Sequence, residues 1–397
     1  MDDVVLVLNS GSSSVKFALF RASSAAVWPV VTRGIIEGIG SSPRMSARDG
    51  AGASLPTPAP PAAVNDAAAA LEHVIGWLRA TFERVRLVGM GHRVVHGGPR
   101  YAAPVIVTRE VLAELERLVP FAPLHQPHNL APIAGAIERL PEVPQVACFD
   151  TGFHRTLPEV ARVIPLARNV LEGGVRRYGF HGLSYEYIAS ALPQVAPEVA
   201  GGRVIVAHLG SGASLCALRA LESIECTFSF TALDGLCMGT RPGAVDPGVI
   251  LYLFQGLKLS VSEVESILYR KSGLLGISDV SNDMRDLLAS DAPGAHLAVD
   301  YFVYRVAQEI GALAASLGGL DALVFTAGIG ENSPVIRRRV CEACAWLGID
   351  FDPQANAANA TRLSRLESAV SVWMVPTDEE LMIARHTGRL LAGQPRG

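Results

Sequence analysis

The sequence predicts an α/β fold of two like-folded domains, because two similar strand–turn–strand units lie half a chain apart and 397 residues exceed the usual size of one compact core. The first unit, VVLVLNSGSSSVKFALF (4–20), leads from an aliphatic run, typical of a strand buried on both faces, into a small polar turn. The second is RVIVAHLGSGASLCALRA (203–220), where Gly210 matches Gly11. We expect each domain to present its turn to a shared cleft.

The first turn suits a phosphate group. It offers backbone N–H groups and hydroxyls that can converge on an anion, a glycine that allows close approach, and a lysine just beyond. These residues are Asn9, Ser10, Gly11, Ser12 and Lys16. Such a turn on its own is equally typical of an ordinary serine-rich hairpin. The second copy, with His208, Leu209, Gly210, Ser211 and Gly212, favours the phosphate-binding interpretation.

A third glycine-rich segment, DALVFTAGIGENS (321–333), follows late in the chain. An apolar strand there leads into a turn containing Gly328 and Gly330, and then into the start of a helix. Nucleotides bind at this kind of position in α/β folds.

Composition and charge favour a small-molecule partner. The formal net charge of −4 gives no basic surface of the kind that binds nucleic acid. No charged segment followed by an apolar one opens the chain, and no apolar run approaches the roughly 20 residues that span a bilayer. We therefore expect a cytoplasmic protein without membrane or nucleic-acid partners.

Two patterns that resemble metal sites are interpreted as structural. Cys341 and Cys344 form a C-x-x-C motif within an expected helix, but no second pair completes a zinc site, and the six scattered cysteines are typical of free thiols. His92 and His96 have a helical metal spacing, yet their surroundings predict strand and turn, which would place them about 13 Å apart.

The remaining elements are expected in the following order. Residues 22–66, rich in alanine, serine and proline, are interpreted as a variable surface connection. Helices are expected up to Phe82 with Asn65 or Asp66 as cap, at 108–119 with Thr108 as cap, and after residue 184. Strands are expected from residue 87 and at 146–149, and a proline-braced loop at 120–129.

Three charged residues stand where function is favoured. Arg93 lies on an otherwise apolar strand beside glycines and needs an anionic partner if buried, which a structural salt bridge would also supply. Asp150 ends a buried strand, where α/β enzymes place catalytic groups, although capping of the next turn is the alternative. Arg241 lies in a glycine- and proline-rich loop, which is more typical of a functional site than of a surface loop without function.

Together these motifs resemble the superfamily of actin, the sugar kinases and the acetate kinases, and seven segments are similar to the acetate kinase family nearly from end to end. They are GHRVVHGG (91–98), PLHQPHN (123–129), FDTGFH (149–154), YGFHGLS (178–184), GTRPGAVDPG (239–248), AGIGENS (327–333) and PTDEELMIARHT (376–387). The resemblance implies two actin-like (ribonuclease H-like) βββαβαβα domains with a nucleotide cleft between them. We assign 1–152 with 381–397 to the acceptor-side domain and 153–380 to the nucleotide-binding domain.

The resemblance implies reversible, Mg²⁺-dependent in-line phosphoryl transfer from ATP to acetate, giving acetyl phosphate and ADP, with Mn²⁺ as a substitute metal and a homodimer as the assembly. Catalytic roles are implied for Arg93, His125, Asp150, His181 and Arg241, and magnesium contacts, mostly through water, for Asn9 and Glu379. Acetate is already ionised at neutral pH and needs no base, so we expect Asp150 to orient a metal-bound water or an arginine.

The resemblance places the nucleotide at the three turns and at one helix start. The residues are Ser10, Ser12, Lys16, His208, Leu209, Gly210, Ser211, Gly212, Asp283, Met284, Arg285, Gly328, Ile329, Gly330, Glu331 and Asn332. For Asp283 and Arg285, a helix capping box is the alternative. Ser211 stands where the family has asparagine, and the loss of an amide group predicts a raised KM for ATP.

The implied acceptor pocket is small and apolar, lined by Val95, Leu124, Phe180 and Ala232 beside Arg93. Ala232 replaces the family's proline, which removes volume and predicts better use of propionate. Gln126 replaces an asparagine, which leaves its contact open.

Three other interpretations follow from the same residues. A propionate or butyrate kinase is the first alternative. A nucleotide-binding switch of the actin or chaperone kind is the second, although it has no use for the arginines and histidines named above. A dinucleotide oxidoreductase is disfavoured because no G-x-G-x-x-G follows the first strand, and no P-loop motif occurs either.

Overall fold

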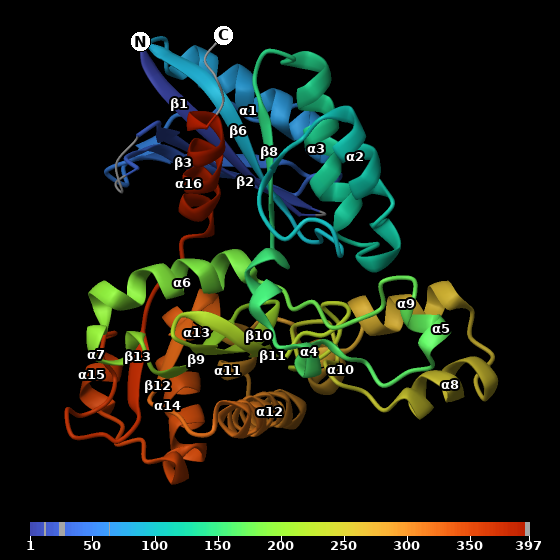
Figure 1. Ribbon diagram of the computed structural model, residues 1–397, viewed down its shortest axis with the longest axis vertical. Coiled ribbons are helices and arrows are strands. Elements are labelled where there is room, and N and C mark those ends of the chain that lie inside the picture. The colour runs from blue at the N-terminus through green and yellow to red at the C-terminus, as the bar shows by residue number, and fades with distance from the viewer. Residues whose placement is uncertain (12, 24–27, 63, 394–397) are drawn as a thin grey trace. The chain divides into compact units, whose positions relative to one another are not determined.

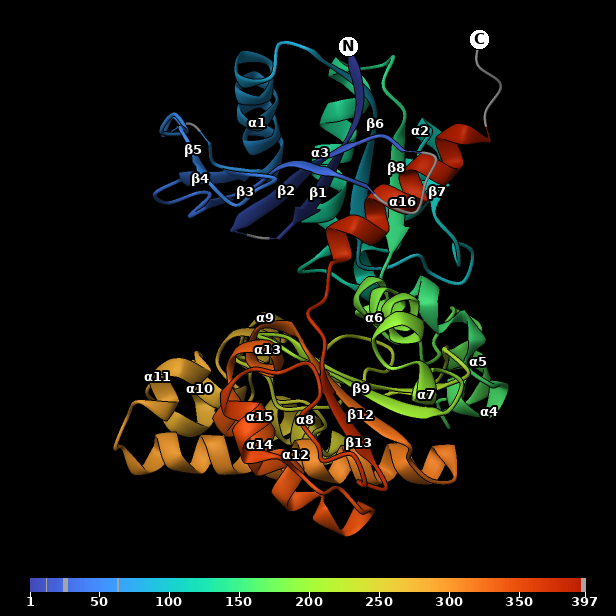
Figure 2. The ribbon, with the colours of Figure 1, turned by 90° about the vertical axis from the view of Figure 1, so that its left-hand side faces the viewer.

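The computed structural model describes residues 1–11, 13–23, 28–62 and 64–393, which form two compact units (Figures 1 and 2). The first unit contains residues 1–152 and 378–397, and the second contains residues 153–377. Ser12, one of the predicted nucleotide-binding residues, lies outside the described residues.

The described part of the first unit is an eight-stranded mixed sheet with helices on both faces. Its elements are β1 (Asp2–Ser10), β2 (Ser14–Arg21), β3 (Val30–Glu37), β4 (Arg44–Asp49), β5 (Ser54–Leu55), α1 (Ala67–Thr81), β6 (Val85–Val94), β7 (Val105–Ile106), α2 (Arg109–Glu116), η1 (Val119–Phe121), α3 (Gln126–Arg139), β8 (Gln145–Phe149) and α16 (Glu379–Ala392). The strands lie in the order β5-β4-β3-β2-β1-β6-β8-β7. β1 pairs antiparallel with β2 and parallel with β6, which pairs parallel with β8.

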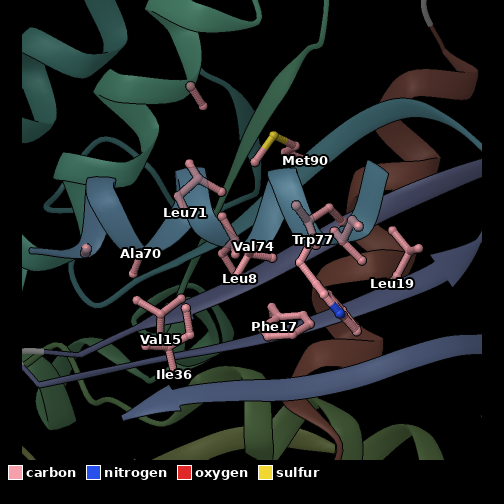
Figure 3. Packing of buried hydrophobic residues seen from close by; sticks show 14 of the residues in the cluster. Leu8, Val15, Phe17, Leu19, Ile36, Ala70, Leu71, Val74, Trp77 and Met90 are labelled. Carbon is pink, nitrogen blue, oxygen red and sulfur yellow. The ribbon is translucent and has the colours of Figure 1, made fainter. Parts of the chain in front are cut away.

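One face of this sheet packs against α1 and α3 in a large apolar core (Figure 3). Leu8 and Phe17, from β1 and β2, lie on the side of Leu71, Val74 and Trp77 of α1. The rings of Phe17 and Trp77 meet edge to face with their centroids 5.7 Å apart. Because side chains alternate between the two faces along a strand, the other side chains of β1 point to the opposite face of the sheet.

α1 and α2 begin where the sequence predicts. The side chain of Asp66 accepts a hydrogen bond from the Ala69 N–H at 2.8 Å, and that of Thr108 accepts one from the Val111 N–H at 3.3 Å. Both caps satisfy N–H groups that lack partners in the first helical turn.

The opposite face of the first sheet carries α16, and two glycines of β6 let this helix approach. Gly89, Gly91 and Arg93 share this face because side chains alternate along a strand. A Cβ on Gly91 would lie 2.4 Å from Thr387 Oγ1, and Gly89 is similarly crowded. The helix therefore lies along β6 with its first residue, Glu379, next to Arg93.

The second unit is a five-stranded mixed sheet with helices. Its elements are α4 (Glu159–Arg162), α5 (Arg168–Leu171), α6 (Gly182–Val195), α7 (Pro197–Ala200), β9 (Arg203–Leu209), β10 (Ala213–Arg219), β11 (Glu222–Cys226), α8 (Pro247–Gln255), α9 (Val261–Arg270), α10 (Gly273–Ser278), α11 (Met284–Leu288), α12 (Pro293–Leu317), β12 (Ala322–Thr326), α13 (Ala327–Asn332), α14 (Pro334–Ala343), η3 (Ala345–Leu347), α15 (Pro353–Ala357) and β13 (Ser371–Met374). η2 (Gly152–Thr156) precedes them and spans the change from one unit to the other. α6 and α12 lie on opposite sides of the sheet (Figures 1 and 2).

The two sheets share one plan. The second has the order β11-β10-β9-β12-β13, and the middle of the first has the order β3-β2-β1-β6-β8. Each sheet contains an antiparallel hairpin, β1–β2 in the first and β9–β10 in the second. The first strand of each hairpin also pairs parallel with a later strand, β1 with β6 and β9 with β12. The predicted α/β fold of two like-folded units, each containing such a hairpin, is confirmed.

Three expectations about local structure are wrong. Residues 22–66 contain β3, β4 and β5, whose strand pattern the alanine- and proline-rich composition concealed. The expected loop 120–129 ends at Gln126, where α3 begins with Pro127 in its first turn, a position that proline favours. Residues 327–332 form the short helix α13, entered through Ala327 in the left-handed region with φ 65°.

The chain returns to the first unit at Asp378. Asp378 caps α16 by accepting the Leu381 N–H, and it forms an ion pair with Arg33 of β3. Residues 378–380 therefore group with the first unit, whereas the sequence-based boundary lies at 381. None of the helices formed by the described residues has the length and apolar character to cross a lipid bilayer.

Lowering the pH is expected to destabilise the fold through two buried histidines. Burial lowers the pKa of His92 and of His154 from 6.5 to about 4. Below pH 6.5 these histidines become protonated in the unfolded chain but stay neutral in the folded chain. Their contribution to the free energy of unfolding is therefore fully present above pH 6.5 and is lost toward pH 4, by about 3 kcal/mol for each histidine.

Urea unfolding at several pH values tests this expectation. The urea midpoint should fall between pH 6.5 and 4.5, and it should fall less in a His92→Gln variant, which has no imidazole to protonate. Equal decreases in the variant and the parent protein would contradict it.

Candidate active site

Four polar side chains of the first unit form one hydrogen-bonded cluster. Arg93 donates from Nε and Nη2 to the carboxylate of Asp150, with Nη2 2.6 Å from Oδ2. Arg93 Nη1 donates to Asn9 Oδ1 at 3.1 Å, and Asn9 Nδ2 donates to Glu379 Oε2 at 3.3 Å. The sequence predicts a functional role for all four residues, and the structure brings them together.

The local folds explain why these residues meet. Asn9 and Arg93 lie near the carboxyl ends of β1 and β6, which are parallel neighbours, and Asp150 follows β8 directly. The Asp150 N–H donates to Val94 O at 3.1 Å, which extends the pairing of β8 with β6 by one residue. Glu379 opens α16, whose positive N-terminal end favours carboxylates.

Acidic groups outnumber the arginine in this cluster. Burial would lower the pKa of Arg93, but the carboxylates of Asp150, Glu379 and Glu380 outweigh it and hold this pKa above its usual value. Burial, together with the charge of Glu379, raises the pKa of Glu380. Asp150 is 1% exposed, so water screens its charge poorly. A further cation would therefore be stabilised beside these carboxylates.

The first hairpin presents two further predicted residues. Lys16 is paired directly with Asn9 across the hairpin, so both side chains lie on the α16 face. Ser10 lies on the other face, and its buried Oγ has no hydrogen-bond partner among the described residues. A buried hydroxyl without a partner is costly, and an oxygen of a bound ligand would satisfy it.

The segment after β6 is held by α3. Gln126 Oε1 accepts the His96 N–H at 3.2 Å, and Gln126 Nε2 donates to His96 O at 3.0 Å. Asn129 Oδ1 accepts the Val95 N–H at 2.9 Å, and Asn129 Nδ2 donates to Ser10 O at 2.6 Å. The contact that the sequence left open at Gln126 is thus a pair of hydrogen bonds to the backbone of His96. Through Asn129, α3 also joins the segment after β6 to the first hairpin.

The predicted acceptor residues are divided between the units. Val95, Leu124 and His125 belong to the first unit, with Val95 buried and His125 at the N-cap of α3. Phe180 and Ala232 belong to the second unit. Phe180 is buried and packs edge to face on Phe228, at 5.9 Å between ring centroids.

In the second unit, the hairpin turn meets the loop that carries Arg241. The Gly239 N–H donates to Ser211 O at 3.1 Å, while the side chain of Ser211 lies at the surface. A Cβ on Gly212 would lie 2.7 Å from Arg241 Nη2 and 3.4 Å from His181 Nε2. Gly212 therefore leaves room for these two side chains to converge, and Arg241 Nη1 donates to Ala232 O at 2.7 Å.

His181 and His208 stack on each other with ring centroids 4.0 Å apart and planes at 27°. His181 lies at the N-cap of α6 in the left-handed region, with φ 57°, an uncommon conformation for a residue with a Cβ. Its Nδ1 lies 2.9 Å from Ser214 Oγ, and His208 Nδ1 lies 2.8 Å from Ser184 Oγ. Each ring is thus held by a hydrogen bond at Nδ1.

The third predicted turn is fixed from within its own unit. Glu331 Oε1 accepts the N–H groups of Ala327 at 2.8 Å and of Thr377 at 3.1 Å. Arg337, which is fully buried, donates to Gly330 O, Glu331 O and the side chain of Asn356. Burial lowers the pKa of Arg337. The remaining predicted residues of this turn, Gly328, Ile329 and Asn332, lie in the same short helix.

Asp283 caps α11. It accepts the Arg285 N–H at 2.8 Å and pairs with the Arg285 guanidinium, whose hydrogen bonds lower the pKa of Asp283 to about 2. The Arg285 side chain is 90% exposed, so solvent screens the pair and it stabilises the fold little. Asp283 thus acts as the N-cap of this helix, whereas a nucleotide contact by Asp283, the buried Met284 and Arg285 stays a prediction.

Sequence reasoning missed the residues that hold the two histidines. Ser184, Tyr185 and Ser214 are buried, and none was singled out. The spacing that could have found Tyr185 is its position four residues after His181, since a helix that begins there, as α6 does, places both on one side.

The repeated sheet order, the two glycine-containing hairpins and the clusters of arginine, histidine and carboxylate define a two-unit α/β protein of the actin-like class. Comparison with known proteins narrows this class. The model of the acetokinase family matches residues 4–385, and the chain belongs to this family.

Relatives and solved structures agree with this assignment. An acetate kinase of Rhodopseudomonas palustris is 54% identical over 99% of this chain and 100% of its own, and one of Nitrobacter hamburgensis is 55% identical over 98% and 96%. The Porphyromonas gingivalis acetate kinase structure is 35% identical over 98% of this chain and 100% of its own, with a TM-score of 0.84. A Francisella tularensis propionate kinase structure is 34% identical over 98% and 99%, with a TM-score of 0.88.

Proposed function

We propose that this protein is an acetate kinase, which transfers the γ-phosphoryl group of Mg-ATP to acetate and releases acetyl phosphate and ADP. The observation that carries the proposal is the Arg93–Asp150–Asn9–Glu379 cluster in a chain that is 54% identical over its full length to an acetate kinase. In each turnover, a carboxylate oxygen of acetate forms a bond to phosphorus as the bond to the ADP oxygen breaks.

Phosphoryl transfer asks for positioning and charge rather than covalent chemistry. Arg93, fixed by Asp150, would pair with the acetate carboxylate or the transferred group. His181 and Arg241, which converge at Gly212, would donate to the oxygens of the transferred group, and the two hairpin turns and α13 would hold the nucleotide. Asp150 already accepts several hydrogen bonds from Arg93, which supports an orienting role rather than one as a base.

The donor set beside Arg93 fits Mg²⁺. Asn9 and Glu379 offer an amide and a carboxylate oxygen, hard ligands that Mg²⁺ accepts while it keeps most of its waters. The excess of carboxylates over arginine favours a cation at this point. When bound, the metal would neutralise charge on the ATP phosphates. Mn²⁺ accepts similar ligands and would substitute.

Trapping of the acyl phosphate with hydroxylamine tests the proposed function. The protein is incubated with Mg-ATP and acetate, propionate or butyrate in parallel, beside a control without acceptor. Product that depends on acetate, at a rate at least equal to that with propionate, is expected. ATP hydrolysis that is indifferent to every acid would overturn the proposal and favour a nucleotide switch.

Propionate kinase is the second candidate, because Ala232 replaces a bulkier residue in the implied pocket and the propionate kinase structure has a TM-score of 0.88. An Ala232→Pro variant is expected to lower the propionate to acetate ratio of kcat/KM by a factor of about 10, since one methylene in such a pocket is worth about 1–3 kcal/mol. Steady-state kinetics with both acids would show this, and an unchanged ratio would contradict it.

The active form is proposed to be a homodimer built on α8. Val249, Leu251 and Tyr252 on this helix are 47%, 56% and 58% exposed, and none of its residues is buried. Exposed apolar side chains grouped in this way mark contact surfaces. A Leu251→Glu variant should give a monomer by light scattering where the parent protein gives a dimer, and an unchanged mass would contradict this.

A cytoplasmic location is part of the proposal. All six cysteines are buried and free, which is typical of a reducing compartment. The two compact units would serve as the acceptor-side and nucleotide-binding domains.

A further inference from the structure

A chain of two buried hydrogen bonds ends on His181. The Tyr185 hydroxyl lies 2.6 Å from Ser214 Oγ, and Ser214 Oγ lies 2.9 Å from His181 Nδ1. Tyr185 and Ser214 are both 0% exposed. In the described part of the chain, Ser214 Oγ is the one hydrogen-bond partner of the Tyr185 hydroxyl.

The directions of these bonds follow from counting protons. A buried phenol must place its hydrogen on an acceptor, and here the acceptor is Ser214 Oγ. Serine carries one hydrogen, which is then left for His181 Nδ1. If Nδ1 carried a proton, it would also point at Ser214 Oγ, and either the serine or the tyrosine hydrogen would lose its acceptor. One arrangement therefore satisfies every group: His181 neutral, with its proton on Nε2.

We propose that Tyr185 and Ser214 are positioning residues that fix His181 as the neutral Nε2–H tautomer, so that it donates a hydrogen bond to the transferred phosphoryl group. The proposal rests on the proposed function for its ligand, but the tautomer itself does not depend on it. Nε2 faces the point where Gly212 leaves room and Arg241 Nη2 converges, which is where an anion would be shared. His181 thus contributes a directed donor, and the positive charge comes from Arg241.

The surroundings of His181 act in the same direction. His208, from β9, stacks on its ring, and Arg241 reaches the same glycine from the neighbouring loop, so its guanidinium would repel a second cation on His181. From α6, Tyr185 adds no charge, because burial raises its pKa well above 10. Phe228 covers another side of the ring, at 5.1 Å between centroids.

Nitrogen-15 NMR of the whole protein, labelled at histidine, tests the tautomer directly. The His181 signals are identified by their loss in a His181→Gln variant. The parent protein should show a protonated Nε2 and an unprotonated Nδ1 at neutral pH. A protonated Nδ1 would overturn the proposal. This reading needs neither ATP nor acetate, so a failure of the proposed function in the trapping assay would leave it intact.

A Tyr185→Phe, Ser214→Ala double variant supplies the second test, because it removes both hydroxyls, so that a proton on Nδ1 no longer deprives another hydrogen of its acceptor. Protonation of His181, followed by NMR, should then begin about 1 pH unit higher, a roughly tenfold change. The kcat with acetate should fall roughly tenfold at pH 6, with a smaller effect on KM. A Ser214→Thr variant, which keeps the hydroxyl, should retain the parent tautomer.

Tyr178→Phe is the matched control. Tyr178 is also buried, and its hydroxyl donates to Gly174 O at 2.7 Å. Its loss should leave the tautomer and the protonation of His181 unchanged. If the double variant behaves like Tyr178→Phe in the NMR titration, the positioning role is refuted. Unfolding curves of each variant identify any that fail to fold. The nitrogen-15 spectrum of the parent protein shows the His181 tautomer without the use of any variant.

Discussion

Replacement of Arg93 by lysine should leave the protein folded and lower kcat/KM for acetate by about 10²- to 10³-fold, the usual cost of losing one preorganised donor at a developing charge. The guanidinium donates through three nitrogens to Asp150 and Asn9 at once. A lysine ammonium is a single point charge and cannot bridge both partners in this geometry. Asp150 would then be buried with fewer donors and would no longer orient the cation.

Arg86→Lys is the control for this experiment. Arg86 lies on the same strand and pairs with Asp3 through Nε at 2.7 Å and Nη2 at 2.8 Å, but its side chain is 64% exposed. Exposed pairs of this kind contribute about 0–1 kcal/mol, and this one is not among the predicted site residues. The kcat/KM of the Arg86→Lys variant for acetate should equal that of the parent enzyme in steady-state assays at saturating ATP. Equal activity of the two lysine variants would remove Arg93 from the proposed site.

A methyl group added at Gly91 should cost about 10²-fold in kcat/KM and raise the Mg²⁺ concentration needed for half-maximal rate, although Gly91 bears no functional group. Its Cβ would lie 2.4 Å from Thr387 Oγ1 and 2.5 Å from Ile383 Cγ2, so α16 must move away from the sheet. Glu379, at the start of this helix, would move away from Asn9 and Arg93. Small displacements of positioning groups have effects of this size, and overpacking costs about 1–3 kcal/mol of stability.

Gly76→Ala tests whether any added methyl would do the same. A Cβ at Gly76, in α1, would meet nothing within 4 Å. Because glycine disfavours a helix interior, this change should stabilise the fold by about 0.5–1 kcal/mol and leave the Mg²⁺ dependence unchanged. The two variants should therefore differ in sign in thermal unfolding. Normal Mg²⁺ dependence in Gly91→Ala would mean that the close contact of α16 with β6 does not position Glu379.

The parts of the site that the sequence predicts are those whose chemistry is local. The hairpins are visible because an aliphatic run and a glycine turn repeat, and Asp150 is visible because it ends a buried strand. The role of Gly91 could not be foreseen, because it depends on a helix that follows almost 300 residues later and packs on the same face. Tyr185 was missed for a similar reason, since its partner Ser214 lies on a different element.

β3 and α13 were not predicted, because the composition or glycine content of each segment concealed its secondary structure. β3, VVTRGIIE, has the β-branched content of a strand, but alanine, serine and proline dominate its surroundings. α13 contains two glycines and was expected as a turn, yet Glu331 and Arg337 supply the hydrogen bonds that hold it as a short helix. Local propensity is a weak guide where tertiary contacts of this kind decide.

The return of the chain to the first unit at Asp378 has a consequence for synthesis. Residues 153–377 are continuous in sequence, whereas the first unit is completed only by α16, which follows them in the chain. Until then the glycine-lined face of β6 has no helix on it, and Asn9 has no Glu379 to bond. A chain shortened before Asp378 should therefore lack turnover, because Glu379 is missing from the cluster with Asn9 and Arg93.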